Sequence, residues 1–440
     1  MKIAFCLHHF LPGYIGGTEI YILNLAKQLI KAHNDVVVII PNPGIEITEE
    51  YYYEEIRIIK YAENSTEDRG MILGNTKPEG LGKFAEILVK ENPSLVHFHE
   101  LAPGRGPCRF HVEKVKELLI PIVITFHVPF YTCFKGTLIY KATEKCDGEI
   151  KIDKCTACIY HYKNITGFKA TLLNTLATNL FKANINATFL NNPVGTAIGF
   201  PFVVNKIKND LLYYAASAEK IIVIAEWYKQ VLRLNKVPAE KIVFIQQGLS
   251  TGSFNKPAAI DVSLPIRVVY IGRITPLKGL HLLIDAILQL PVEKICLSIY
   301  GLETEDDYVV SLKNKTRAIE NITWHGRISP ATVVPALSSY HLLCLPSAFE
   351  MSPLVIQEAF AAGIPVIASD VNGNAEQIKD GINGWLFSTN DSGNLKDKLS
   401  ALVNNTSLID SAKKQLPILN TFEEVGNAHQ TLYGGILKDF

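Results

Sequence analysis

The chain lacks two features that would each assign it to a special class of protein. It has no excess charge of one sign, because 43 Lys and Arg residues balance 43 Asp and Glu residues. That balance argues against a nucleic-acid-coating protein, whose surface would be basic. It also has no uninterrupted run of about 18 apolar residues, so we expect no transmembrane helix.

The start of the chain does not resemble a secretion signal. Its apolar run is short and is broken by His8 and His9 before a glycine-rich segment. A signal peptide carries a longer apolar stretch and a small-residue cleavage site, so we interpret this run as a first strand. Eight Cys in 440 residues without a signal favour reduced thiols over a disulfide scaffold. We therefore expect a cytoplasmic protein.

The length of 440 residues is two to three times that of a typical domain, so at least two domains are expected. Short β-rich runs alternate with helical patterns, which predicts parallel sheets joined by helical crossovers. The predicted strands are 3–7, 36–41, 57–61, 95–99, 122–126, 220–225, 242–246, 266–271, 295–300, 321–325, 342–345 and 365–368. The predicted helical segments are 19–30, 83–90, 112–119, 168–216, 227–234, 280–288, 330–338, 354–362 and 421–437. The predicted fold class is α/β, with two Rossmann-like doubly wound domains.

The expected domains follow the breaks in this alternation. An N-terminal domain covers 1–253 and carries an insertion at 128–165, which is rich in aromatic residues, Cys, Gly and charges. Residues 254–264 are the predicted linker, because Ser, Gly, Pro and Asn gather around them. A C-terminal domain covers 265–420, and the last helix lies in 421–440.

The first candidate site is the segment GYIGG at 13–17, between the first strand and the first helix. Glycines allow close backbone approach to a ligand, and the N-terminus of the next helix offers free N–H donors. The combination suits a phosphate, although a flexible loop would have the same composition. It is not GxGxxG, which weakens a nicotinamide-dehydrogenase interpretation.

The second candidate site is GRITPLKG at 272–279, directly after a predicted strand. Ligands of doubly wound sheets bind at the carboxyl ends of strands, so Arg273 and Lys278 fall where a ligand would lie. Arg grips phosphate with a fork of donors and Lys supplies a point charge. The alternative is a pair of solvated surface cations.

The third candidate site contains two carboxylates eight positions apart, Glu350 in a loop and Glu358 on the next helix. Carboxylates accept hydrogen bonds from the hydroxyls of a sugar or ribose. We expect Leu354, Val355 and Ala359 to pack inward on that helix. An exposed helical glutamate is the simpler explanation for Glu358 taken alone.

The surrounding sequence closely resembles the family 4 glycosyltransferases. The resemblance is carried by Glu350 with the segments EAFAAGIPVIA at 358–368 and NAEQIKDGING at 374–384, by the Arg273–Lys278 segment, and by GGTE at 16–19. It runs from near residue 3 to about residue 388. It implies the GT-B architecture, in which two Rossmann-like domains face each other across a cleft. It also implies a nucleoside-diphosphate-sugar donor, retention of anomeric configuration and no catalytic metal.

The resemblance also implies a role for each matching residue. Arg273 and Lys278 neutralise the donor diphosphate, Glu350 contacts the donor sugar, and Glu358 binds the ribose. Amides around Ser352 and Leu354 help to hold sugar and phosphate, Gly16 and Gly17 cover the diphosphate, and His127 lies beside the anomeric carbon. The chain departs from the commoner family pattern at Met351-Ser352-Pro353, where many members have Gly-Phe-Gly, and at Val128, where many carry an acidic residue. The first departure leaves the donor sugar open.

Four cysteines form a further candidate site within the insertion, namely Cys133, Cys146, Cys155 and Cys158. The last two are spaced as CxxC, at which two thiolates commonly share one zinc ion. A subset of family 4 enzymes is similar here, which implies a structural Zn²⁺ with His161 as a substitute ligand. Reduced thiols without metal are the alternative. The other cysteines, Cys6, Cys108, Cys296 and Cys344, lie in or near apolar segments and are expected in the core.

The function predicted from these features is transfer of a sugar from a UDP- or GDP-linked donor to a hydroxyl acceptor. The acceptor is expected to be a glycan or lipid-linked saccharide of surface polysaccharide or glycolipid assembly. Residues 168–208 are expected either to pack in the core or to make a peripheral contact with the inner face of the cytoplasmic membrane, and His99-Glu100 is a candidate acceptor contact. The alternatives are a sugar-nucleotide epimerase on the same fold and a catalytically silent nucleotide- or glycan-binding module.

Overall fold

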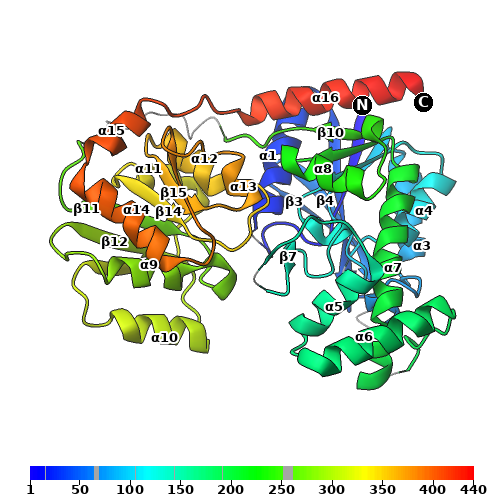
Figure 1. The fold of residues 1–440 in the computed structure, drawn as a ribbon. Coiled ribbons are helices and arrows are strands. Elements are labelled where there is room, and N and C mark those ends of the chain that lie inside the picture. The colour runs from blue at the N-terminus through cyan, green and yellow to red at the C-terminus, as the bar shows by residue number, and fades with distance from the viewer. Residues whose placement is uncertain (15, 64–68, 105, 143, 191, 251–260) are drawn as a thin grey trace. The chain divides into compact units, whose positions relative to one another are not determined.

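The structure is a computed structural model that describes all residues except 15, 64–68, 105, 143, 191 and 251–260. The chain divides into two compact units, shown in Figure 1. Unit 1 comprises Met1–Gln246 together with Glu423–Phe440, and unit 2 comprises Gln247–Phe422. Most of the predicted linker 254–264 lies outside the described residues, as does Ile15 of the glycine-rich loop.

Unit 1 is built on an eight-stranded sheet in the order β10-β9-β6-β5-β1-β2-β4-β3. The strands are β1 (Lys2–Cys6), β2 (Asp35–Pro43), β3 (Glu49–Tyr53), β4 (Ile56–Glu63), β5 (Leu95–Phe98), β6 (Ile122–Phe126), β9 (Lys220–Val223) and β10 (Ile242–Phe244). All neighbours pair in parallel except the edge strand β3, which is antiparallel to β4. The chain winds outward from β1 in one direction and from β5 in the other, so the strand order reverses between these two strands.

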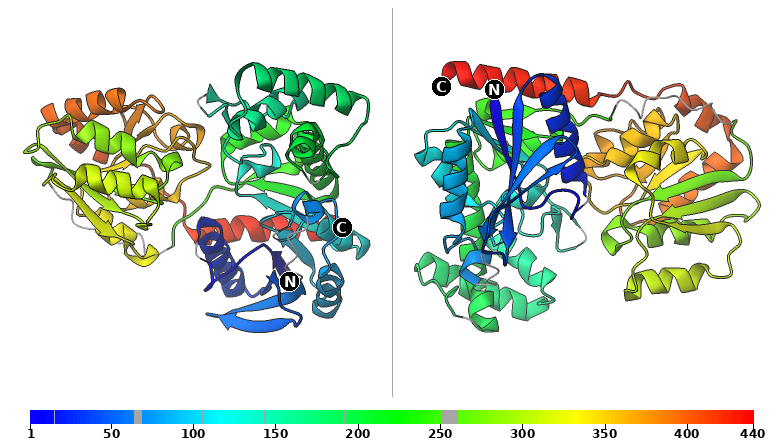
Figure 2. Two further views of the ribbon diagram at one scale, coloured as in Figure 1. Left: turned by 90° about the horizontal axis from the view of Figure 1, so that it is seen from below. Right: turned by 180° about the vertical axis from the view of Figure 1, so that it is seen from behind.

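Helices cover both faces of this sheet (Figure 2). The helices of unit 1 are α1 (Gly17–Lys31), α2 (Arg69–Ile72), α3 (Leu81–Glu91), α4 (Arg109–Glu117), α5 (Ile152–Tyr162), α6 (Gly167–Lys182), α7 (Pro193–Ser217), α8 (Glu226–Leu234) and α16 (Phe422–Asp439). Tyr433 of α16 hydrogen-bonds His97 of β5, with 2.7 Å between its hydroxyl and Nδ1, and Tyr21 of α1 contacts His429 of α16. Helices α1 and α16 therefore share one face of the sheet.

Unit 2 contains a six-stranded, fully parallel sheet in the order β13-β12-β11-β14-β15-β16. The strands are β11 (Ile266–Ile271), β12 (Ile295–Tyr300), β13 (Ile322–Gly326), β14 (Leu342–Leu345), β15 (Val366–Ser369) and β16 (Gly384–Phe387). In chain order this is 3-2-1-4-5-6, the Rossmann arrangement, and the order reverses between β11 and β14. The helices are α9 (Leu280–Ile287), α10 (Asp307–Thr316), α11 (Val333–Leu337), α12 (Leu354–Ala361), α13 (Asn372–Ala375), α14 (Ser392–Asn404) and α15 (Ser407–Lys413).

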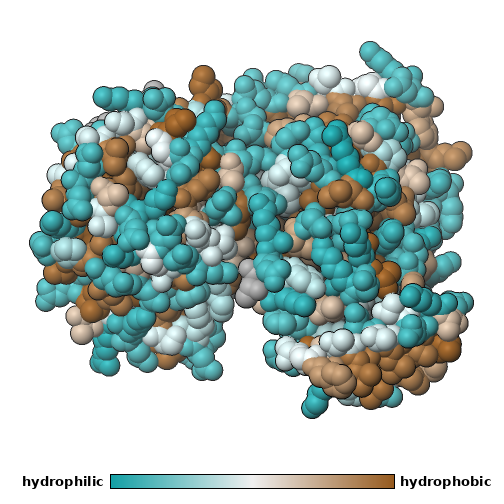
Figure 3. All heavy atoms as spheres, viewed as in Figure 1, coloured by the Kyte–Doolittle hydropathy of each residue, from teal (hydrophilic) through white to brown (hydrophobic). Residues whose placement is uncertain are grey.

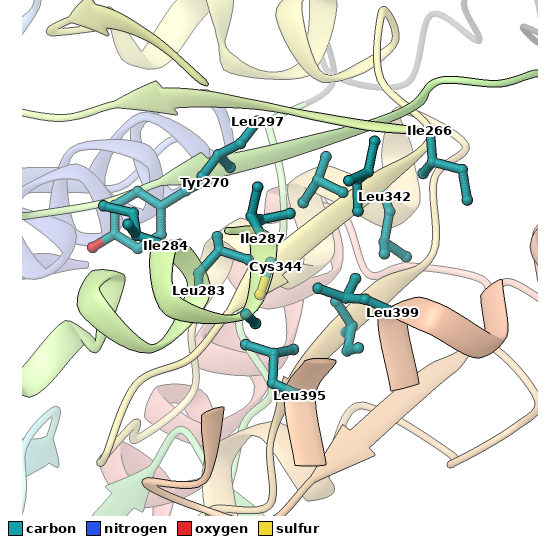
Figure 4. Close-up of a cluster of buried hydrophobic side chains, with 14 of the residues drawn as sticks. Ile266, Tyr270, Leu283, Ile284, Ile287, Leu297, Leu342, Cys344, Leu395 and Leu399 are labelled. Atoms are coloured by element: carbon teal, nitrogen blue, oxygen red, sulfur yellow. The ribbon is translucent and has the colours of Figure 1, made fainter. Parts of the chain in front are cut away.

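The central strand β14 of unit 2 is buried on both faces. Leu342 and Cys344 enter the core that Leu283 of α9 and Leu399 of α14 complete (Figure 4). Leu343 and Leu345 enter a second core with α11 and α12. Successive side chains of a strand point to opposite faces, so the continuous apolar run is what a doubly covered parallel strand requires.

The two sheets confirm the predicted α/β fold class. Strands β11, β12 and β14 lie at the predicted residues. Strands β3 and β16 and helices α10, α14 and α15 were not predicted, and Tyr51 within β3 donates a hydrogen bond to Leu11 O at 2.7 Å. The prediction that Cys296 lies in the core is wrong, since that side chain is only half-buried. None of the helices in the described residues is long and apolar enough to cross a membrane.

Candidate active site

The candidate site of unit 2 lies at the carboxyl ends of β11 and β14, where the strand order reverses. Arg273 and Lys278 follow β11, and Glu350 follows β14. Lys278 Nζ lies 2.6 Å from Glu350 Oε1, and the two side chains are only 18% and 9% exposed. The fold therefore joins two sequence motifs into one charged pair at the position where doubly wound sheets bind ligands.

Gly279 allows the two loops to approach this closely. It has φ +70°, and a Cβ placed there would lie 2.0 Å from Pro346 O. Ala348 N donates to Leu277 O at 2.8 Å, which fastens the loop after β14 to the loop after β11. Both the left-handed backbone and the lack of space exclude a side chain at this position.

Arg273 is held by its backbone while its side chain extends into solvent. The buried Tyr270 hydroxyl donates to Arg273 O at 2.7 Å. The guanidinium has no ion pair with any residue that the structure describes. It is therefore an exposed cation whose five N–H donors are available to an anion.

Helix α12 adds a third source of positive potential. It begins at Leu354 after Pro353, and its first amides have no partner within the helix. The preceding turn is held by Gln247 Nε2, which donates to Ser352 O at 3.2 Å. Of the residues expected to face inward, Ala359 is buried and Val355 is half-buried against the same core, whereas Leu354 is only half-buried; Ile356 and Phe360 are buried as well. Ile356, Ala359 and Phe360 have the spacing i, i+3 and i+4 of one helix face, and this is the face that enters the core.

Glu358 lies one helical turn after Leu354 on α12 and is half-buried. Loss of hydration on burial raises the pKa of its carboxyl to about 7. The carboxyl makes no hydrogen bond or ion pair within the described part of the chain. Such a group gains from hydroxyl donors, because a ligand restores the hydrogen bonds that burial removed.

Sequence reasoning missed the contribution of α13. A Cβ on Gly373 would lie 2.4 Å from Glu350 O, so this short helix packs directly under the Glu350 backbone. Asn374 Nδ2 donates to Ser369 O at 3.0 Å and is fully buried. Gly373 directly precedes the NAEQI segment and Asn374 is its first residue, yet the proximity of Gly373 to Glu350 depends on the pairing of β14 with β15.

Unit 1 has a cavity at its own reversal of strand order, between β1 and β5. The cavity measures about 420 Å³ and has a mostly apolar wall that includes Phe130, Ile207 and Leu211. His8 and Glu100 also line it, with 3.9 Å between His8 Nδ1 and Glu100 Oε2. Burial, and secondarily the charge of Glu19, raises the pKa of Glu100 to about 7. Of the predicted pair His99-Glu100, only Glu100 reaches this cavity.

His99 instead belongs to a buried group of histidines that also contains His127. His99 Nδ1 lies 3.2 Å from His127 Nε2, and His97 and His429 stack nearby. Burial lowers the pKa of all four, to about 3 for His127 and about 4 for His429, and neighbouring imidazoles lower it further for His97, His99 and His127. They are therefore neutral hydrogen-bonding groups at neutral pH.

The Gly16–Gly17 segment forms the start of α1. Gly16 is the N-cap with an extended backbone, and Glu19 Oε2 would lie 2.6 Å from any Cβ placed on it. The buried Glu19 carboxylate thus already occupies part of the helix N-terminus.

The four cysteines of the insertion line one cavity, together with Leu138 and Ile159. His161 is not among its lining residues. Burial raises the pKa of the Cys155 thiol to about 11. The described residues contain no group of three or more His, Cys, Asp or Glu side chains placed to hold a metal ion. The thiols share a cavity without forming a ligand set.

Comparison with known proteins finds two matching families. Residues 261–416 match the family described as "Glycosyl transferases group 1", and residues 15–150 match "Glycosyltransferase Family 4". Together the two matches include more than half of the chain and the candidate site of unit 2.

The chain belongs to glycosyltransferase family 4.

Three individual proteins illustrate this membership. An uncharacterized glycosyltransferase of Methanocaldococcus jannaschii is 29% identical over 197 residues, which are 44% of this chain and 53% of that protein. The crystal structure of HepE from Anabaena in complex with UDP and glucose superposes with a TM-score of 0.62 at 16% identity and covers 99% of this chain and 100% of its own. The structure of WaaG, a glycosyltransferase involved in lipopolysaccharide biosynthesis, gives 0.61 at 15% identity and covers 98% and 100%.

The family 4 chain spans about half the length of the curated relatives that it matches. The structural neighbours are below 20% identity, so they establish the fold of both units and no more. The site residues of this chain must therefore be argued from its own contacts.

Proposed function

We propose that this protein transfers a sugar, with retention of anomeric configuration, from a nucleoside-diphosphate-sugar to a hydroxyl acceptor. The proposal depends chiefly on one observation, the Lys278–Glu350 pair at the reversal of strand order in unit 2. The ammonium of Lys278 can bind a diphosphate, and the carboxylate of Glu350 can bind a neighbouring sugar hydroxyl. Each ligand group then replaces part of the interaction between the two side chains. UDP is the first donor nucleotide to test, because HepE was crystallised with it.

In this proposal Arg273 and Lys278 stabilise the departing diphosphate, with help from the amides of Ser352 and Leu354 at the start of α12. The bond between the anomeric carbon and the diphosphate breaks, so negative charge grows on the leaving group. Glu350 orients the sugar, and Glu358 accepts hydrogen bonds from the ribose hydroxyls. No catalytic metal is required, because the cations and the helix N-terminus supply the positive charge.

The resemblance assigns three residues of unit 1 to the same reaction. Gly16 and Gly17 contact the diphosphate, and His127 contacts the reacting carbon. The neutral imidazole of His127 is suited to a hydrogen bond and unsuited to ion pairing.

The apolar cavity of unit 1 is the proposed acceptor site. Its wall suits an acceptor that carries hydrocarbon or a sugar face, and Glu100, with a pKa near 7, is suited to accept a proton from a hydroxyl. An acceptor glycan or lipid-linked saccharide of surface polysaccharide or glycolipid assembly fits this composition. We place the reaction in the cytoplasm, where nucleotide sugars are made.

The test is turnover by the variants Arg273→Ala, Lys278→Ala and Glu350→Ala, followed as UDP release and as glycosylated product. We expect each variant to lose turnover heavily while its far-UV circular dichroism stays unchanged. Near-normal turnover in all three would refute the site assignment. A product isomeric with the donor and no transfer would identify an epimerase, and donor binding without UDP release would identify a binding module.

A structural Zn²⁺ at Cys133, Cys146, Cys155 and Cys158 is a separate and smaller proposal. It is supported by the convergence of the thiols on one cavity, whereas their present placement does not form a ligand set. Metal analysis of protein purified without added zinc tests it, and well under one equivalent would refute it.

A further inference from the structure

The segment between Asp153 and Asp210 has an unusual charge pattern. It contains no Asp or Glu, while six lysines lie within it, at 154, 163, 169, 182, 206 and 208. The whole chain is neutral, so this excess is local. The segment includes all of α6 and most of α7.

Helix α6 presents an apolar face to solvent. Phe168, Leu172 and Leu176 are spaced four residues apart and are 81%, 61% and 48% exposed. Residues four apart lie one above another on a helix, so the three side chains form one stripe. We call this stripe the α6 face. Figure 3 shows apolar atoms gathered in the region where Figure 1 labels α6.

The opposite side of α6 attaches it to unit 1. Ala177 is fully buried, and α6 packs against α5 and α7. Phe189 and Val194, in the turn after α6 and at the start of α7, are also 78% and 64% exposed. The apolar stripe is therefore held outward by the packing of the other side and is continued by its neighbours in the chain.

Lysines border the α6 face and are not neutralised. Lys169 lies in the first turn and Lys182 in the last, and neither they nor Lys163 form an ion pair in the part of the chain that the structure describes. A lysine in the first turn is unfavourable for the helix dipole, so Lys169 does not stabilise the helix itself.

We propose that the α6 face docks on an anionic lipid bilayer. An interfacial helix places apolar side chains among the acyl chains and basic side chains among anionic headgroups, which is the pattern found here. A second copy of this chain is a poor occupant, because a two-fold interface would place the same lysine-bordered face against itself. The charge pattern thus selects a negatively charged partner surface.

Helix α7 connects the docking surface to the acceptor cavity. Val194 is exposed near its start, whereas Ile207 lines the cavity, and 13 residues of helix separate them by about 20 Å. If the proposed transferase function is correct, an acceptor anchored in the bilayer would need its sugar to extend this far. The docking itself does not depend on that function.

The experiment measures co-sedimentation of the full chain with vesicles of phosphatidylcholine mixed with phosphatidylglycerol, and with vesicles of phosphatidylcholine alone. We expect binding to the mixed vesicles that weakens with added salt. The double variant Phe168→Ser/Leu172→Ser should lower partitioning at least about tenfold, because it removes most of the apolar stripe. The control Val89→Ser, which removes an equally exposed apolar side chain of α3, should bind like the wild type.

A second pair of variants tests the charge. Lys169→Glu/Lys182→Glu should reduce binding to the mixed vesicles, whereas Lys116→Glu on α4 should not. Absence of wild-type binding, or equal binding by the Phe168/Leu172 double variant, would overturn the proposal. So would a dimer in light scattering that the same double variant dissociates. Stabilisation by UDP is measured on the same preparations, so failure to dock is distinguished from failure of the donor site.

Discussion

Replacing Lys278 by Met tests the central pair of the site, because it leaves the Glu350 carboxylate only 9% exposed and without its cation. Breaking one partner of such a buried pair costs about 3 kcal/mol, the lower end of the range, since the ammonium retains some contact with water. For a unit of this size that corresponds to a fall in melting temperature of roughly 6 to 12 °C. The double variant Lys278→Met/Glu350→Gln should recover at least half of this loss, because no charge then stays unpaired.

Donor binding should respond differently from stability. A charge-assisted hydrogen bond to phosphate contributes about 1.5 to 3 kcal/mol, so Lys278→Met should weaken UDP binding by roughly tenfold to a hundredfold. The double variant should remain as weak, because the cation is still missing. Arg317→Ala, which removes an exposed cation of unit 2 outside the site, is the control for loss of positive charge and should bind UDP normally.

The assays are calorimetric unfolding, with the transition of unit 2 identified by its response to UDP, and titration calorimetry with UDP. The reasoning is refuted if Lys278→Met melts like the wild type, or if the double variant is no more stable than the single one. It is also refuted if UDP affinity returns in the double variant.

Three further predictions follow from single residues and groups. Because the Glu358 carboxyl has a pKa of about 7 and hydroxyl donors favour its charged form, UDP affinity should rise from about pH 6 to 8, more steeply than in Glu358→Gln; equal titration curves would contradict this. The buried imidazoles of His127 and His429 have pKa values of about 3 and about 4, below the ordinary 6.5. At a pH between those lowered values and 6.5, these imidazoles are protonated in the unfolded chain and neutral in the folded one. Stability should therefore fall as the pH drops below 6.5, by about 1.4 kcal/mol per pH unit for each imidazole, and urea unfolding at pH 6.5 and 5.5 measures it; an unchanged midpoint would contradict it. Gly279→Ala should destabilise unit 2 by at least about 2 kcal/mol in urea unfolding, because alanine is strained at φ +70° and its Cβ would meet Pro346 O; a loss below 0.5 kcal/mol would be inconsistent with the observed turn.

The local pattern of the sequence was sufficient to predict the elements that position the candidate site of unit 2. Strand β14 is a continuous apolar run and β11 is one apart from Arg267, and this is the pattern of a strand buried on both faces. The periodicity of α12 was also clear, although its exact phase was not, because Leu354 and Val355 are as apolar as Ile356. Short or polar elements such as β3 and α10 were missed, since their burial depends on neighbours far away in the chain.

The tertiary structure alone decided which of these residues meet. Lys278 and Glu350 are 72 positions apart and are joined only because β11 and β14 are neighbours in the sheet. The same holds for the cavity that combines Glu100 with Ile207, and for the separation of His99 from its sequence neighbour Glu100. The absence of acid around α6 can be read from the sequence, but its apolar stripe could equally have entered the core. Whether it did depended on which side of α6 packs against α5 and α7, because helix amphipathicity specifies that a face is apolar and not what covers it.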